Sequence, residues 1–154
     1  QLVNGGMTFW DRIEDVEIRG FKILFPHTGI RCTGDWANKQ VTISDNRIVG
    51  ASHEGVYMGV SKATKNTSDR VTITGNVIDT CGWDGIQVGN WRNCWIGENK
   101  ILRCGLSDEF GQWHALCINP GSQAWIWRNH IADCKRRLIV NDATIYWEEK
   151  PKGI

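Results

Sequence analysis

Hydrophobic and polar residues alternate in short runs along this chain, and the runs recur in the same order. From Val41 the sequence reads VTISDNRIVGASHEGVYMG, and from Val71 it reads VTITGNVIDTCGWDGIQVG. Each copy has an apolar pair two residues apart, then Asn and Ile, and finally a Gly before a second apolar pair. Alternation with a period of two is typical of strands, so each copy predicts three short strands joined by polar turns.

Less regular copies extend the pattern in both directions. They begin at Val16, Cys94 and Ala124, and a last copy begins at Ala143 and is cut off. A unit of about 25 residues cannot bury its own apolar face, whereas stacked units bury a continuous core. We therefore predict an all-β parallel solenoid of about five coils, a single domain over residues 1–154. Each strand pairs with its equivalent one coil away, about 4.8 Å along the axis.

Two columns of residues test this alignment. The repeat Asn is found at Asn46, Asn76, Asn99 and Asn129, with spacings of 30, 23 and 30 residues, and a cysteine follows five positions later at Cys81, Cys104 and Cys134. Asn side chains can bond turn backbone and one another from coil to coil, so we interpret this ladder as structural. We interpret the cysteines as small core residues. No Cys-x-x-Cys pair occurs, so no zinc site is expected.

The repeated pattern apolar-x-Ile-x-x-Asn-x-Ile, followed by Gly-Ile-x-Val, resembles the coil of right-handed parallel β-helices in the pectate-lyase-like superfamily. The resemblance extends from about Asp15 to the C-terminus. Members of that superfamily include polysaccharide lyases, polygalacturonases and phage tailspikes. The resemblance implies a right-handed β-helix with a long acidic glycan along one face, in an extracellular or virion-associated protein. The Asn-Thr-Asp, Asp-Asp and Gly-His-Gly set of polygalacturonases is not found, so no catalytic residues are carried over.

Composition excludes two classes of partner. The net charge of +1 leaves no basic field for nucleic acid, and no apolar stretch is long enough to span a membrane. No aspartate cluster suited to Ca²⁺ is visible, so no cofactor is expected, with Ca²⁺ left open as the alternative. The chain starts at Gln1 without Met and shows no polar cap, from which we expect a segment of a longer protein.

The turns that enter the Gly-Ile-x-Val strands carry the strongest candidates for catalysis. The residues just before these strands are Glu54, Asp84, His114 and Arg137, and they are expected to form one line with neighbours about 5 Å apart. Paired carboxylates suit a glycoside hydrolase. A lyase instead needs a base and a cation, for which His114 and Arg137 or Arg31 could serve. Alternatively, Glu-Gly and Asp-Gly are ordinary turn residues without a catalytic role.

Other residues are predicted to contact the substrate. The outward column of the same strands contains Arg31, Tyr57, Gln87, Cys117 and Ile139, and Trp83 and Trp113 lie beside the acidic line. Two insertions flank this surface: a polar run, Ser61–Ser68, predicted to be a surface loop, and Leu106–Gln112. The second insertion contains Asp108 and Glu109, each a reserve acid or base, or simply part of a solvated loop.

The nine tryptophans suggest a second surface. Trp95 and Trp125 occupy the outward column held by Thr42 and Thr72, on a different sheet from the acidic line. Exposed stacked aromatics suit either a sugar platform or a subunit contact, such as a homotrimer. The sequence therefore predicts a polysaccharide-active β-helix, a lyase or a glycoside hydrolase. The alternative is a non-catalytic glycan-binding or structural β-helix of a tailspike or adhesin.

Overall fold

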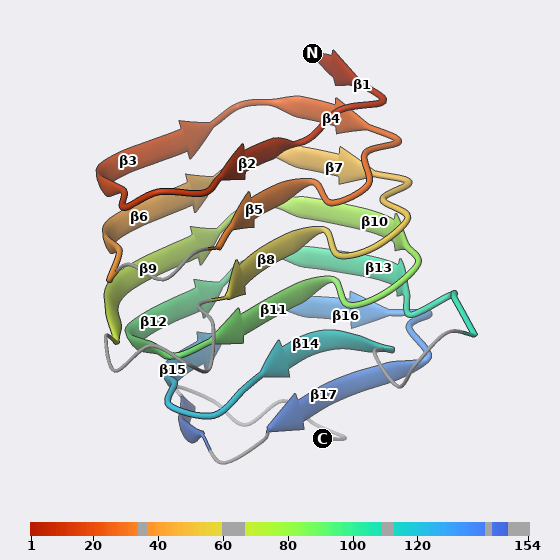
Figure 1. Cartoon of the computed structure of the whole chain (residues 1–154). Helices are drawn as coiled ribbons and strands as arrows, with labels where there is room; N and C mark the ends of the chain where they lie inside the picture. Colours follow the sequence, from red (N-terminus) through yellow and green to blue (C-terminus); the bar gives the residue numbers. More distant parts are fainter. Residues whose placement is uncertain (34–36, 60–66, 109–112, 141–142, 148–154) are drawn as a thin grey trace.

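The polypeptide winds into a stack of coils built from β-strands (Figure 1). The computed structural model describes residues 1–33, 37–59, 67–108, 113–140 and 143–147. Within these ranges, eighteen strands form three parallel sheets of six strands each. Among the described residues there is no helix that is long and apolar enough to cross a membrane.

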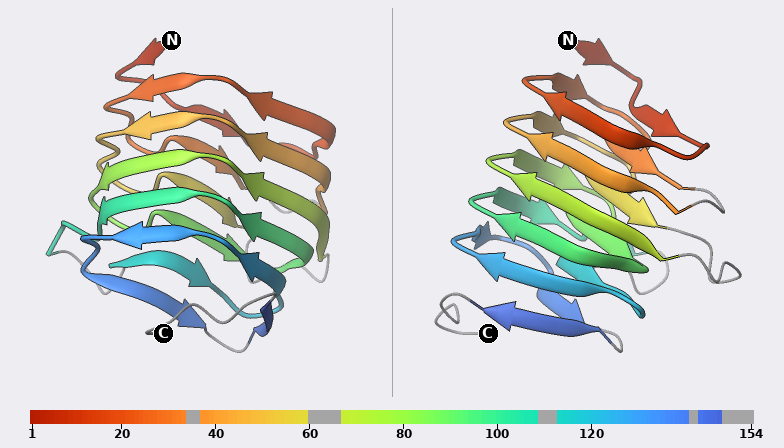
Figure 2. Two further views of the ribbon diagram at one scale, coloured as in Figure 1. Left: turned by 180° about the vertical axis from the view of Figure 1, so that it is seen from behind. Right: turned by 90° about the vertical axis from the view of Figure 1, so that its left-hand side faces the viewer.

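The three sheets form the three faces of the stack (Figure 2). Sheet A contains β1 (Leu2–Val3), β4 (Lys22–Leu24), β7 (Arg47–Val49), β10 (Val77–Cys81), β13 (Lys100–Cys104) and β16 (His130–Ala132). Sheet B contains β2 (Met7–Phe9), β5 (Ile30–Cys32), β8 (Val56–Gly59), β11 (Ile86–Gly89), β14 (His114–Ile118) and β17 (Arg136–Val140). Sheet C contains β3 (Glu14–Arg19), β6 (Lys39–Ser44), β9 (Ser68–Thr74), β12 (Trp91–Gly97), β15 (Gln123–Trp127) and β18 (Thr144–Trp147).

The number of coils agrees with the sequence repeats. Each complete coil passes through sheets C, A and B in turn, and five such coils run from β3 to β17. The strand β18 belongs to the last copy recognised in the sequence, whereas β1 and β2 lie before the first. Strands of equal position pair in parallel, so the predicted parallel solenoid is confirmed.

The core is built from columns of small and branched apolar residues. Val41 pairs with Val71 and Val71 with Cys94, while Ile43 pairs with Ile73 in the next inward column. All of these residues are buried, and so is the Cys81–Cys104 pair on sheet A. The six cysteines are free thiols. Cys32, Cys81, Cys94 and Cys104 are buried in the core and Cys134 packs against it, as interpreted, whereas Cys117 lies in the outward column of sheet B.

The Asn ladder is also confirmed as a structural feature. Asn46 Nδ2 donates to Asn76 Oδ1 (3.1 Å), Asn76 Nδ2 to Asn99 Oδ1 (3.0 Å), and Asn99 Nδ2 to Asn129 Oδ1 (2.9 Å). Each of these accepting amides also accepts from the backbone N–H of the Asn one coil before it. The ladder therefore satisfies buried polar groups at the turn between sheets C and A.

The structure corrects one expected loop boundary. Ser68, at the end of the predicted surface loop, is buried and begins β9. Its hydroxyl accepts a hydrogen bond from the backbone N–H of Asn38 (3.0 Å), just before β6 begins. The polar composition of the run concealed this inward-facing hydroxyl. Residues 61–66 of the same run lie outside the described residues.

Candidate functional site

The outer face of sheet B brings together most of the predicted substrate contacts. Arg31, Tyr57, Gln87 and Cys117 stand in one column, in register from β5 to β14. Beside them lies a cleft of about 280 Å³, lined by His27, Arg31, His53, Glu54, Tyr57, Trp83 and Gln87. Five of these residues are expected from the sequence. The two histidines fall on this edge in the alignment but carry no predicted role.

Stacked rings form one wall of the cleft. The His53 ring lies between His27, at a centroid distance of 3.7 Å, and Trp83, at 3.6 Å. The stack follows from the coil register, because backbone hydrogen bonds link these three positions from one coil to the next. The cleft therefore presents aromatic surface next to its charged groups.

The opposite part of the cleft is cationic. The Arg31 guanidinium lies over the rings of Trp10 (5.2 Å) and Tyr57 (5.4 Å). Its Nε is buried and has no hydrogen-bond partner in the structure. A buried donor without an acceptor is unfavourable, so this guanidinium is well suited to a ligand that supplies acceptor oxygens.

Glu54 supplies the carboxylate of the cleft and Tyr57 its phenol. The Glu54 carboxylate is largely buried and accepts a hydrogen bond from Thr28 Oγ1 (3.1 Å). Burial, together with the negative charge of Glu54, raises the pKa of the Tyr57 phenol. The Tyr57 phenol is therefore protonated at neutral pH and can donate a hydrogen bond.

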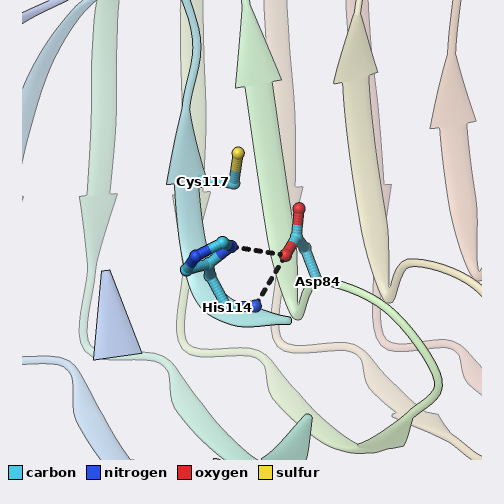
Figure 3. A group of neighbouring side chains, drawn as sticks. All are labelled: Asp84, His114 and Cys117. Carbon is cyan, nitrogen blue, oxygen red and sulfur yellow. Dashed lines mark hydrogen bonds and ion pairs between the residues drawn. The ribbon is translucent and has the colours of Figure 1, made fainter. Parts of the chain in front are cut away.

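The next two members of the acidic line do not line the cleft. Asp84 is fully buried, and its Oδ1 accepts from the backbone N–H of His114 (2.7 Å) and lies 3.3 Å from His114 Nδ1 (Figure 3). Burial raises the pKa of Asp84, although the N–H and imidazole of His114 oppose the shift. His114 is also buried. The two residues adjoin in successive coils as predicted, but they face each other rather than solvent.

The register corrects the position of Arg137. His114 pairs with Arg136, and Leu116 pairs with Leu138. Arg136 therefore continues the line of ionisable residues, and Arg137 follows Ala115 in the neighbouring column. The Leu116–Leu138 pair fixes this register, because His114 and Arg136 each stand two residues before their leucine.

The remaining predicted contacts lie away from the cleft. Trp113 is covered by Lys135 Nζ (4.3 Å from the ring centroid) and by the Arg136 guanidinium (5.3 Å). Asp108 is exposed, and its Oδ1 lies 3.2 Å from Lys135 Nζ. Ile139 pairs with Cys117, as the outward column predicted. Glu109 lies outside the described residues.

Asp84, His114 and Cys117 form a compact group of possible metal ligands. One donor atom from each lies within 4.8 Å of the other two, and all three residues are buried. No zinc site was expected from the sequence, because it contains no Cys-x-x-Cys pair. A search for that spacing cannot find this group, which contains a single cysteine. The signal that could have found it is the coil register, which aligns Asp84 with His114 and places Cys117 three residues further on the same strand.

Sheet C carries the second predicted surface. The Trp95 and Trp125 rings stack at 4.8 Å, and Tyr146 continues the stack at 4.7 Å. A cleft of about 480 Å³ lies along these rings, together with Trp127 and Trp147. Trp95 is 42% exposed and Tyr146 44% exposed. This aromatic face is separate from the cleft on sheet B.

Comparison with known proteins adds the fold family. No curated protein and no solved structure matches this chain. A family model described as a right-handed β-helix region matches residues 10–147, which include all five complete coils. Together with three parallel sheets of six strands each, this match shows that the chain belongs to the right-handed β-helix family.

Proposed function

We propose that this protein binds an acidic polysaccharide across sheet B and cleaves it in the cleft. The observation that carries the proposal is the assembly of Arg31, Glu54 and Tyr57 in one cleft, beside the stacked rings of His53 and Trp83. Sugar rings pack against aromatic faces, and a guanidinium binds carboxylates with two parallel hydrogen bonds. This combination fits a uronic-acid-type glycan better than a neutral one.

The lining of the cleft favours elimination over hydrolysis. Hydrolysis commonly uses two carboxylates on either side of the glycosidic bond. Among the described lining residues Glu54 is the one carboxylate, and Asp84 is buried against His114. Elimination needs one base, one proton donor and a cation that neutralises the uronate, all of which the cleft contains.

The proposed reaction assigns each group one role. Glu54 takes the proton from the sugar carbon that bears the carboxylate, while Arg31 stabilises the charge that develops on that carboxylate. The electron pair of the broken C–H bond forms a carbon–carbon double bond, and the bond to the glycosidic oxygen breaks. Tyr57, which stays protonated at neutral pH, gives its proton to the leaving oxygen. The products are an unsaturated uronate and a new sugar hydroxyl.

A panel of acidic and neutral polysaccharides tests this proposal. We expect an acidic glycan to bind and to yield the ultraviolet absorbance of an unsaturated uronate together with new reducing ends. Glu54→Gln should abolish product but keep binding, since the amide retains an acceptor for Thr28. Arg31→Ala should weaken binding roughly 10- to 100-fold, the usual value of a charge-assisted hydrogen bond. Arg47→Ala, an exposed arginine on sheet A, is the matched control.

Glycan binding without cleavage is the second candidate. It is favoured by the burial of Asp84 and His114, two of the residues expected to be catalytic. Arg31-dependent binding without any product would select it and would fit the stem of a tailspike or adhesin, either extracellular or on a virion. Reducing ends without absorbance would instead identify a hydrolase. Absence of binding to every acidic glycan would refute both candidates.

A further inference from the structure

Behind the cleft, two buried oxygen atoms lack a donor. Asp84 is fully buried, and its Oδ2 has no hydrogen-bond partner, although its Oδ1 accepts from His114. The Oε1 atom of Gln87 is also buried and unpartnered, and Gln87 stands beside Cys117 in register. Buried acceptors without donors are costly, so two of them within four residues, in β11 and the turn that enters it, indicate a missing positive group.

The surrounding side chains identify the kind of group that would fit. Figure 3 shows the Asp84 carboxylate, the His114 imidazole and the Cys117 thiol gathered at the start of β14, and one donor atom from each lies within 4.8 Å of the others. Hard cations such as Ca²⁺ and Mg²⁺ prefer oxygen ligands alone. A mixed set of oxygen, nitrogen and sulfur is typical of zinc.

The distances are close to those of a zinc site. With zinc–ligand bonds of roughly 2.0–2.3 Å, donors around a tetrahedral ion lie about 3.5 Å apart. Asp84 Oδ1 lies 3.3 Å from His114 Nδ1, which places the carboxylate group, although not Oδ2 itself, at about this spacing from the imidazole. The three donor atoms lie within 4.8 Å of one another, so the widest pair would have to close by up to about 1.3 Å when an ion binds.

We propose that Asp84, His114 and Cys117 bind one zinc ion. Asp84 Oδ2 is the atom that gains the ion, because Oδ1 remains bonded to the His114 backbone N–H. The ion would be enclosed, since the three residues are at most 6% exposed. The ion would connect the turn before β11 to β14. It would thereby hold two residues at the cleft: Trp83, which precedes Asp84 in sequence, and Gln87, which pairs with Cys117. This inference does not depend on glycan cleavage.

Zinc titration of the full chain, reduced and stripped with a chelator, tests the site. We expect one zinc ion per chain in competition with a chromophoric chelator, and a rise in melting temperature on loading. Co²⁺ should bind in its place and show a thiolate charge-transfer band. Cys117→Ser should abolish that band and weaken zinc binding. The loss should be at least roughly 10- to 100-fold, because that is the usual effect of removing a residue that only hydrogen-bonds to a metal ligand. Cys134→Ser, a half-buried cysteine outside the group, is the matched control and should bind as the wild type does.

A second variant tests the site in case Cys117→Ser does not fold. Asp84→Asn keeps an acceptor for the His114 N–H but replaces the anionic oxygen, so it should fold and still lose zinc affinity. Circular dichroism of each variant in chelator establishes that it is folded. The proposal is overturned if the wild type takes up no zinc, which would leave a buried water as the partner of Asp84. It is equally overturned if folded Cys117→Ser or Asp84→Asn binds zinc as tightly as the wild type.

Discussion

Tyr57 shows how one residue's surroundings set its chemistry. It stands between Arg31 and Gln87 in the outward column of sheet B, and it is half-buried. Burial and the nearby Glu54 raise its pKa from the ordinary value of 10.0, while Arg31 opposes the shift. The folded protein therefore holds the phenolic proton more tightly than the unfolded chain does.

This difference predicts a pH dependence of stability. Above about pH 10 the unfolded chain loses the Tyr57 proton first, so the native state binds more protons and the free energy of unfolding falls as pH rises. Tyr57→Phe removes this contribution, and its unfolding free energy should decline less steeply from about pH 9 to 11 than that of the wild type. Urea unfolding at each pH measures the difference.

The second tyrosine provides the control for this experiment. Tyr146 lies on the exposed aromatic face of sheet C, far from Arg31 and Glu54 in the coil order. Tyr146→Phe should retain the wild-type slope. If Tyr57→Phe and the wild type declined in parallel, Tyr57 would not be the group that the folded cleft holds protonated.

At the scale of the element, the turn between sheets C and A depends on the Asn ladder. Asn76 is fully buried, accepts from Asn46 N (3.0 Å) and donates to Ile43 O (2.9 Å). Asn76→Ala leaves these groups without partners, and we expect a loss of about 3 kcal/mol or more in unfolding free energy. Asn129→Ala should cost less, because Asn129 is half-buried and water can replace its bonds. Chemical denaturation compares the two, and equal losses would contradict a role for burial.

The strands of sheet C allow a sharper test of register. Ile73 is fully buried between Ile43 and Ile96, whereas Thr72 faces outward between Thr42 and Trp95. Ile73→Asp buries an unpaired carboxylate and should cost more than about 4 kcal/mol in unfolding free energy. Thr72→Asp, one residue away, should cost less than about 1 kcal/mol. Thermal melting monitored by circular dichroism measures the stability of both variants. An unchanged melting curve for Ile73→Asp would contradict the register.

At the scale of the whole molecule, the repeat made the fold predictable. An apolar pair, an Asn and a Gly at fixed offsets determine which residues stack, so the alignment of the repeats is enough to assign columns such as Arg31–Tyr57–Gln87. The column to which a residue is assigned does not show how deeply its side chain is buried. Asp84 and Glu54 occupy the same column, yet only Glu54 reaches the cleft, because Asp84 is bonded to His114 on the next coil.

Two other features of the site differ from the sequence prediction. The predicted position of Arg137 is one residue out, because the pairing of Leu116 with Leu138 places Arg136, not Arg137, beside His114. The Asp84–His114–Cys117 group combines a turn residue with two strand residues of the next coil, and a search by local spacing does not join them. Sequence periodicity thus predicts neighbours along the stack, whereas contacts between a turn and the adjacent strand depend on side-chain direction and depth.

The aromatic face of sheet C carries the remaining prediction, the homotrimer. The stacked rings of Trp95, Trp125 and Tyr146 form a continuous apolar surface, and such exposed surfaces mark contacts with a ligand or another chain. If the contact is with two further copies, sedimentation equilibrium should give about three times the 17.5 kDa mass of the chain. Trp125→Ser should then dissociate the trimer, because it removes the central ring of the stack. Trp10→Ser, an exposed tryptophan beside the cleft on sheet B, should leave it intact. A mass of 17.5 kDa for the wild type would contradict the trimer.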